Sequence, residues 1–216
     1  MSNLAAGRLY GILDLGYVAQ SDARRTVAAM IAGGVDLIQF RAKNLELAEI
    51  ARLAAEIHSE TSGSDVPLVI NDHAEIARDI GAEGVHVGQN DQSVAAAREI
   101  VGAQCLIGKS THSLEQATRA MAEGADYIGW GPLFATPTKP DYVPIGLGNI
   151  AAVHAAVTKP IFCIGGIKLA NLPQVIASGA RRVVIVSGLL QAANVAEYAR
   201  AAKALLDQKS EIRNQK

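Results

Sequence analysis

The sequence has few aromatic residues and almost no net charge, and each shortage excludes a class of protein. Aromatic residues make up 4% of the 216 residues, so a core must be built mainly from alanine, valine, isoleucine and leucine. The formal net charge of −1 gives no electrostatic reason to expect binding to nucleic acid or to an anionic membrane surface. We therefore expect neither of these partners.

Cysteine and long apolar runs are also scarce. The two cysteines, Cys105 and Cys163, provide neither a disulfide framework nor metal-ligand spacing, and both lie in strand-like runs where we expect them buried and reduced. No apolar run reaches the ~18 residues of a membrane span. Residues 3–8 are neither long nor apolar enough for a signal peptide. These shortages predict a cytoplasmic protein.

What the sequence does contain is a regular alternation of short β-like runs with alanine-rich helical runs. The predicted strands are Leu9–Leu13, Asp36–Phe40, Leu68–Ile70, Gly84–Val87, Cys105–Ile107, Tyr127–Gly129, Ile161–Ile164 and Val183–Val186. The predicted helices are Asp22–Ala32, Glu46–Glu60, Ala74–Ile80, Ser93–Val101, Leu114–Ala122, Asn149–Ala156, Leu172–Ala177 and Val195–Lys209. Ser21 and Ser113 stand where they can cap helix starts, and glycines such as Gly81 and Gly102 follow predicted helix ends.

This alternation predicts an α/β fold with a parallel sheet. Eight strand–helix repeats in 216 residues suit a (β/α)8 TIM barrel near its lower size limit. A doubly wound open sheet is the alternative, but it normally has fewer strands, and no GxGxxG motif follows the first strand. We predict that residues 1–216 form a single barrel domain, with its functional groups at the carboxyl ends of the strands.

Polar residues continue the second predicted strand. Gln39, Arg41 and Lys43 share one face because side chains alternate along a strand, whereas Ile38 and Phe40 point the other way. In a barrel this polar face lines the mouth. Two cations there would be desolvated without a partner unless an anion binds between them. The alternative is that nearby carboxylates neutralise them.

Two carboxylates follow the next two strands. Asn71 and Asp72 end the third strand, and Asp91 follows the fourth. Neighbouring barrel strands bring Asp72 and Asp91 to adjacent loops, beside the cations of the second strand. Two such carboxylates with a substrate phosphate suit Mg²⁺. The alternative is that each aspartate caps the helix that follows it. We predict that Asp72 and Asp91 are metal ligands.

A second anion site is predicted near the end of the barrel. Gly165 and Gly166 follow the seventh strand, and Val186 and Ser187 end the eighth. Barrel enzymes often bind phosphate with these two loops, and glycine lets backbone N–H groups approach an anion closely. The two anion sites together suggest that two phosphorylated substrates are joined, with Mg²⁺ on the more highly charged one.

The loop from Pro132 to Gly148 lies between the two predicted anion sites. It contains Thr136, Thr138 and Lys139, and its prolines restrict the backbone. Two hydroxyls and an ammonium on a stiffened loop suit an anion-binding lid. The alternative is an ordinary solvated loop.

The fifth strand ends in the segment Gly108-Lys109-Ser110-Thr111-His112. Ser110 can donate to a phosphate, or it can begin the next helix. His86 and His112 are candidate acid–base groups, but a lone histidine on an apolar strand is more often a core residue, and we assign neither a catalytic role.

Together these residues resemble the thiamine phosphate synthase family. The resemblance rests on Gln39-x-Arg41-x-Lys43, Asn71-Asp72, His86-x-Gly88-Gln89-x-Asp91, Thr136-x-Thr138-Lys139, Gly165-Gly166 and Val186-Ser187. It implies a barrel that joins hydroxymethylpyrimidine diphosphate to a thiazole phosphate, with or without a carboxylate on the thiazole, and releases pyrophosphate.

The resemblance also implies roles for individual residues. It assigns Asp72 and Asp91 to Mg²⁺, and it makes Arg41, Lys43, Lys139 and Ser110 catalytic. The residues implied to bind the pyrimidine diphosphate are Gln39, Arg41, Lys43, Asn71, Ser110 and Lys139. The residues implied to bind the thiazole phosphate are Thr136, Thr138, Gly166, Val186 and Ser187. Lys109 replaces an expected small apolar residue, and Trp130 can either lie near the pyrimidine or serve in packing.

Three other functions are compatible with parts of this pattern. A thiazole tautomerase would typically carry a histidine in place of Pro132 and would need neither aspartate. A non-catalytic barrel could bind a phosphorylated ligand as a sensor. A sugar-phosphate epimerase would need paired carboxylates or metal-binding histidines at strand ends. The sequence leaves the oligomeric state open, including a homo-oligomer.

Overall fold

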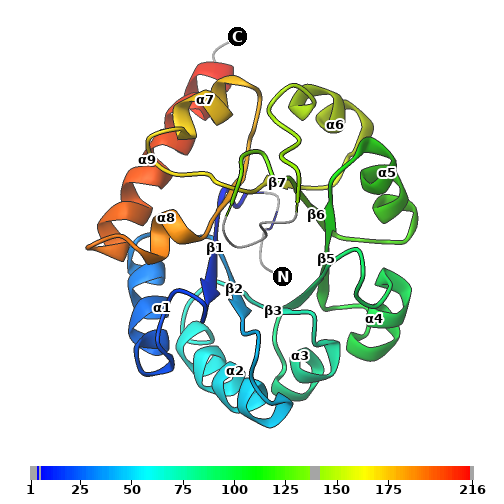
Figure 1. Cartoon of the computed structure of the whole chain (residues 1–216), viewed down its shortest axis with the longest axis vertical. Helices are drawn as coiled ribbons and strands as arrows, with labels where there is room; N and C mark the ends of the chain where they lie inside the picture. The colour runs from blue at the N-terminus through cyan, green and yellow to red at the C-terminus, as the bar shows by residue number, and fades with distance from the viewer. Residues whose placement is uncertain (1–3, 5, 137–141, 215–216) are drawn as a thin grey trace.

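A ring of parallel strands forms the centre of the molecule. The computed structural model describes residues 4, 6–136 and 142–214. Strands β1 to β8 close into a barrel in sequence order, and Figure 1, viewed along the barrel, shows the helices surrounding them. The strands are β1 (Leu9–Asp14), β2 (Leu37–Arg41), β3 (Leu68–Asn71), β4 (Gly84–Val87), β5 (Leu106–Thr111), β6 (Tyr127–Trp130), β7 (Ile161–Cys163) and β8 (Val183–Ile185). The predicted (β/α)8 barrel is therefore confirmed.

The helices connect successive strands and cover the outside of the ring. They are η1 (Gln20–Asp22), α1 (Ala23–Ala32), α2 (Leu47–Thr61), α3 (Ala74–Ile80), α4 (Val94–Val101), α5 (Leu114–Ala122), α6 (Ile150–Ala156), α7 (Leu172–Ala177), α8 (Ser187–Leu190) and α9 (Val195–Asn214). In the described part of the chain, none of these helices combines the length and apolar character that crossing a membrane requires.

Two helix starts show where capping predictions succeed and fail. Ser113 caps α5 as predicted, accepting a hydrogen bond from the backbone N–H of Gln116 at 3.2 Å. Ser21 does not cap α1, because it lies inside the 3₁₀ turn η1 and Asp22 takes the N-cap position. The short helix α8 was not predicted, since the apolar run that ends in Val186 gave no signal that a helix begins at the next residue.

Strand β5 is longer than its apolar residues predict. It begins after Cys105 and extends through the polar residues Lys109 to Thr111. This extension pairs with β6, where Ser110 lies opposite Gly129 and Thr111 opposite Trp130. Cys105, which precedes the strand, is only half-buried and not buried as predicted. Cys163 is fully buried as predicted, and both cysteines are free thiols.

Side chains that point into the barrel form their own core, separate from the core between strands and helices. This inner core contains Tyr10, Ile12, Leu37, Val69, Tyr127, Phe162 and Val184. The rings of Tyr10, Tyr127 and Phe162 pack edge to face, with centroids 5.3 to 6.0 Å apart. Ile38 and Phe40 belong to the outer core, which confirms the predicted alternation along β2.

Gly108 on β5 makes room for this inner core. A Cβ atom at that position would lie 2.2 Å from Cζ of Tyr127 and 2.4 Å from Nδ1 of His86. The absence of a side chain therefore allows the ring of Tyr127 to reach across to β4 and β5.

We expect Gly108→Ala to lower the free energy of unfolding by about 1–3 kcal/mol, because the added methyl group overpacks the inner core. Urea denaturation followed by circular dichroism measures this change. Gly63→Ala is the matched control, since a Cβ there meets no heavy atom within 4 Å. An unchanged unfolding midpoint for Gly108→Ala would show that Tyr127 can move aside without cost.

Candidate active site at the barrel mouth

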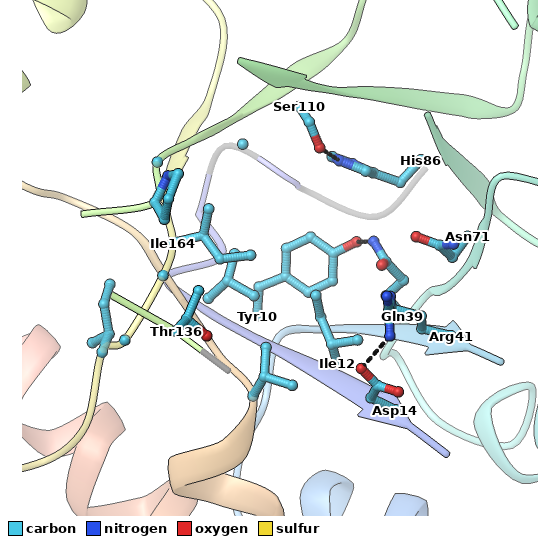
Figure 2. Close-up of a pocket in the computed structure, with 18 of the residues that line it drawn as sticks. Tyr10, Ile12, Asp14, Gln39, Arg41, Asn71, His86, Ser110, Thr136 and Ile164 are labelled. Carbon is cyan, nitrogen blue, oxygen red and sulfur yellow. Dashed lines mark hydrogen bonds and ion pairs between the residues drawn. The ribbon is translucent and has the colours of Figure 1, made fainter. Parts of the chain in front are cut away.

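A pocket opens at the carboxyl ends of the strands, where a barrel of this kind places its functional groups. Eight of the predicted site residues line it, namely Gln39, Arg41, Asn71, Ser110, Thr136, Gly166, Val186 and Ser187. Figure 2 shows the ring of Tyr10 at its centre, with Gln39 and Arg41 from β2 on one side and Ser110 from β5 on another. Sequence positions far apart in the chain therefore converge on one cavity.

Of the other predicted site residues, three lie outside the pocket lining and two lie outside the described residues. Lys43, Asp72 and Asp91 are absent from the pocket lining and occupy the loops after β2, β3 and β4. Thr138 and Lys139 lie outside the described residues.

Arg41 is held by a carboxylate that the sequence analysis missed. Its Nη1 atom lies 2.5 Å from Oδ2 of Asp14, which is 2% exposed. The expectation that Arg41 lacks a partner without an anion was wrong, and the alternative of a neighbouring carboxylate is correct. The barrel register places Asp14 directly opposite Arg41 on the adjacent strand. This pair orients the guanidinium at the pocket wall.

Lys43 also has a carboxylate partner. Its Nζ atom lies 2.5 Å from Oδ2 of Asp72, and the lysine side chain is half exposed. The expectation of an unpartnered cation was therefore wrong for Lys43 as well. β2 ends at Arg41, so Lys43 extends from the loop rather than from the strand face.

Asp72 adopts an unusual backbone conformation. Its φ of 66° lies in the left-handed region, which asparagine and aspartate tolerate better than most residues. Such conformations persist where the surroundings hold them, and here the Asp72 N–H donates to the carbonyl of His86 at 2.8 Å. Burial acts to raise the pKa of the Asp72 carboxyl, but hydrogen bonds with Lys43, Asp91 and Asn71 and the Lys43 charge bring the pKa below its ordinary value.

Neither aspartate caps the helix that follows it, which removes the capping alternative. His73 is the N-cap residue of α3 without a side-chain cap, and Ser93 caps α4. Asp91 instead accepts a hydrogen bond from the backbone N–H of Gly88 at 2.7 Å. Asp91 is near enough to Asp72 to contribute to the lowered pKa of the Asp72 carboxyl.

The two carboxylates fit a Mg²⁺ site that a substrate completes. Within the described residues no group of three or more histidine, cysteine or acidic side chains could hold a metal by itself. Mg²⁺ commonly binds one or two carboxylates together with water and substrate phosphate, so a pair of carboxylates is enough.

The opposite side of the pocket is formed by a glycine turn after β7. Gly165 and Gly166 have φ values of 99° and 66°, and a Cβ at Gly166 would lie 2.7 Å from Cβ of Phe134. The Asn171 side chain fixes this turn, since its Nδ2 donates to the carbonyl of Gly166 at 3.0 Å and its Oδ1 accepts from the Lys168 N–H at 2.8 Å. These hydrogen bonds fix the conformation of a turn that lines the pocket.

Several pocket residues were missed from the sequence. Tyr10, Ile12 and Asp14 all line the pocket, and the alternation rule that found Gln39 and Arg41 on β2 would have found them on β1. His86 and His112, which were given no role, also line it. His86 hydrogen-bonds through Nε2 to Oγ of Ser110 at 2.9 Å, and this contact depends on strand neighbours that sequence spacing does not reveal.

Two open questions from the sequence are settled by geometry. Lys109 is 7% exposed, lies outside the pocket lining, and donates from Nζ to the carbonyl of Gly88 at 2.7 Å. It therefore supports the loop that carries Asp91. Burial lowers its pKa from the ordinary lysine value. Trp130 is 1% exposed and belongs to the outer core, so its role is packing.

The fold and site define a barrel whose polar mouth suits phosphorylated ligands. Comparison with known proteins makes the assignment specific. Residues 9–189 match the family model described as thiamine monophosphate synthase. The chain is 39% identical over 207 residues to a thiamine-phosphate synthase from Chloroflexus aurantiacus, with 95% of each chain covered. It is 40% identical over 198 residues to the one from Thermus thermophilus, covering 90% of this chain and 95% of the relative.

A solved structure agrees with these relatives. The thiamine phosphate pyrophosphorylase from Pyrococcus furiosus superposes with a TM-score of 0.85 at 28% identity, covering 93% of this chain and 96% of that one. The chain belongs to the thiamine monophosphate synthase family and is a transferase of thiamine biosynthesis. The resemblance inferred from the residues is thus confirmed.

The lowered pKa of Asp72 predicts an acid-dependent contribution to stability. Because the folded pKa lies below the unfolded value of about 3.9, Asp72 stabilises the fold fully above that pH, and this contribution disappears as pH falls through the folded pKa. We expect Asp72→Asn to lower the urea midpoint at neutral pH and to approach the wild type as the pH falls through the folded pKa of Asp72.

The control for this measurement is Asp65→Asn, an exposed carboxylate in the loop before β3, at the opposite end of the barrel. A constant difference between Asp72→Asn and the wild type at all pH values would contradict the role of the Lys43–Asp72 pair.

Proposed function

We propose that this barrel joins 4-amino-2-methyl-5-hydroxymethylpyrimidine diphosphate to a thiazole phosphate, with or without a carboxylate, and releases pyrophosphate with the help of Mg²⁺. The observation that carries the proposal is the convergence of Gln39, Arg41, Asn71 and Ser110 from three strands on one pocket that the Gly165–Gly166 turn also lines. A diphosphate would bind on the first side, and a monophosphate on the second. The whole chain would act as one barrel domain.

The diphosphate side is rich in hydrogen-bond donors. Arg41 presents its guanidinium beside Asp14, and Lys43 lies on the adjoining loop. Lys139, which lies outside the described residues, is proposed to contribute a third cation. These cations would stabilise the negative charge that builds on the departing pyrophosphate. Catalysis would then depend on positioning and electrostatics, with the thiazole nitrogen capturing the pyrimidine fragment after pyrophosphate leaves.

Asp72 and Asp91 are proposed to hold Mg²⁺ together with the diphosphate. When bound, the ion would neutralise charge on the leaving group. The low pKa of Asp72 supports this role, because its carboxylate stays ionised at neutral pH. Lys109 would keep the Asp91 loop in place through Gly88.

On the thiazole phosphate side, backbone groups rather than charged side chains are proposed to bind the phosphate. Gly166, Val186 and Ser187 line the pocket there, together with Thr136. Thr138 is proposed to join them. Gly165 and Gly166 line the pocket in a turn with positive φ, and backbone N–H groups of such a turn suit a phosphate. Pro132 also lines the pocket at the position where a tautomerase would carry a histidine, and this disfavours the isomerase alternative. Cytoplasmic location and a homo-oligomeric state stay predictions.

A coupling assay tests the proposed reaction. Purified protein is mixed with Mg²⁺, the pyrimidine diphosphate and the thiazole phosphate, and thiamine phosphate is detected after oxidation to a fluorescent thiochrome. We expect product that disappears when EDTA removes the metal and returns when Mg²⁺ is added in excess. Absence of product with every divalent metal would reject the synthase reaction.

We expect Asp91→Asn to lower turnover by about 100-fold or more, because the metal contributes several kcal/mol of charge stabilisation. The amide oxygen can still accept from the Gly88 N–H, so the circular dichroism spectrum and urea midpoint should change little. Asp79→Asn on the exposed surface of α3 is the control and should keep wild-type turnover. A near-normal Mg²⁺-dependent rate for Asp91→Asn would remove this residue from the metal site.

A further inference from the structure

A continuous chain of hydrogen bonds crosses the floor of the pocket from Gln39 to Ser110. Gln39 Nε2 donates to the Tyr10 hydroxyl at 2.6 Å, and the hydroxyls of Tyr10 and Tyr127 lie 3.1 Å apart. The Tyr127 hydroxyl lies 3.2 Å from Nδ1 of His86, whose Nε2 lies 2.9 Å from Oγ of Ser110. We call these five residues the floor chain. Figure 2 shows both of its ends, at Gln39 with Tyr10 and at His86 with Ser110.

The direction of hydrogen bonding at the Gln39 end follows from the donors available. An amide N–H can only donate, so the Tyr10 oxygen accepts from Gln39. Burial raises the pKa of both Tyr10 and Tyr127 well above the ordinary tyrosine value, so both phenols keep their protons. With its oxygen engaged by Gln39, the Tyr10 hydroxyl directs its own proton to Tyr127.

The same logic sets the direction at the Ser110 end. Having accepted from Tyr10, the Tyr127 hydroxyl donates to Nδ1 of His86. A neutral imidazole carries one proton, and with Nδ1 accepting, that proton lies on Nε2. Nε2–H then donates to Oγ of Ser110. The hydroxyl proton of Ser110 is thereby directed away from His86, toward a ligand in the pocket.

We propose that Tyr10 and Tyr127 are positioning residues, which fix the proton of His86 on Nε2 and thereby make Ser110 a hydrogen-bond donor to the bound substrate. The identity of that substrate rests on the function proposed above, whereas the proton position in the ligand-free protein does not. A donor at Ser110 suits an anionic oxygen acceptor, in keeping with the guanidinium of Arg41 in the same pocket.

The opposite direction would give Ser110 the opposite role. If the Gln39 carbonyl oxygen faced Tyr10, each hydroxyl would point the other way, His86 would carry its proton on Nδ1, and Ser110 would donate to His86. Ser110 would then be an acceptor for the substrate. The position of one proton on His86 therefore distinguishes the two arrangements.

Nitrogen NMR of the ligand-free protein tests the proposal directly. The chain has five histidines, and a His86→Gln variant assigns the His86 signals. We expect a protonated Nε2 and an unprotonated Nδ1 at a pH where the ring is neutral. In Tyr127→Phe we expect this preference to be lost or reversed. Tyr198→Phe, which removes a tyrosine hydroxyl outside the floor chain, should leave the His86 signals unchanged.

Two results of that experiment would overturn the proposal. A proton on Nδ1 in the wild type would show the opposite direction. A proton that stays on Nε2 to the same extent in Tyr127→Phe would show that Tyr127 does not set it. Since neither measurement needs substrate, an inactive protein in the coupling assay would reject the proposed function without affecting this result.

Kinetics separates positioning from a merely structural role. We expect Tyr127→Phe to lower kcat by about 3- to 10-fold, the worth of one hydrogen bond, with a smaller change in KM. In a Ser110→Ala background the same substitution should have no further effect on kcat, because it acts through Ser110. Equal kcat losses in both backgrounds would contradict action through Ser110.

Discussion

The filling of the barrel interior is the constraint on which the rest of the structure depends. A closed parallel barrel must be packed inside, and here three edge-to-face rings, Tyr10, Tyr127 and Phe162, do most of this packing. Two of these rings carry hydroxyls, which need hydrogen-bond partners once buried. The partners come from the layer above, and that layer is the floor of the pocket. Core packing and site geometry are therefore built from the same residues.

The cationic side chains at the mouth of the barrel are neutralised by ion pairs with carboxylates rather than by full exposure to solvent. Arg41 lies against the buried carboxylate of Asp14, and Lys43 lies against Asp72. For the buried Arg41–Asp14 pair, removing either partner would leave an uncompensated charge, which is far more costly than the pair itself is stabilising. The pairing fixes the direction of the Arg41 side chain before any ligand arrives. It also means that anion binding at Lys43 must compete with Asp72.

The sequence was sufficient for the barrel because its evidence is local and repeated. The strand–helix units show their own hydrophobic periodicity, and glycines mark many of the helix ends. Ser113 caps α5 as its position predicts. Most of the predicted site residues that line the pocket followed from one rule, that strand ends meet at the mouth. Arg41 shows the limit of this rule. Its partner Asp14 lies 27 positions away in sequence, and only the register of β1 with β2 brings them together.

The floor chain could not be predicted from the sequence for the same reason, because it depends on which strands are neighbours in the barrel. His86 on an apolar strand looks like a core histidine until Tyr127 and Ser110 are placed on either side of it. Ser21 failed as a cap because a 3₁₀ turn at η1 displaced the helix start by a single residue, a shift too small for spacing to reveal. Lys109 could be placed only once β5 was seen to continue beyond its apolar residues.

The pairing at the mouth also bears on selectivity. Among the described residues of this corner, Arg41 and Lys43 carry two positive charges, whereas Asp14, Asp72 and Asp91 carry three negative ones, so these residues do not form a purely basic anion site. A bare phosphate from the surroundings would meet carboxylates as well as cations. A diphosphate that arrives with its own divalent cation satisfies both kinds of group at once. Under the proposed function, the aspartates would therefore select against the abundant small anions that a purely basic pocket would retain.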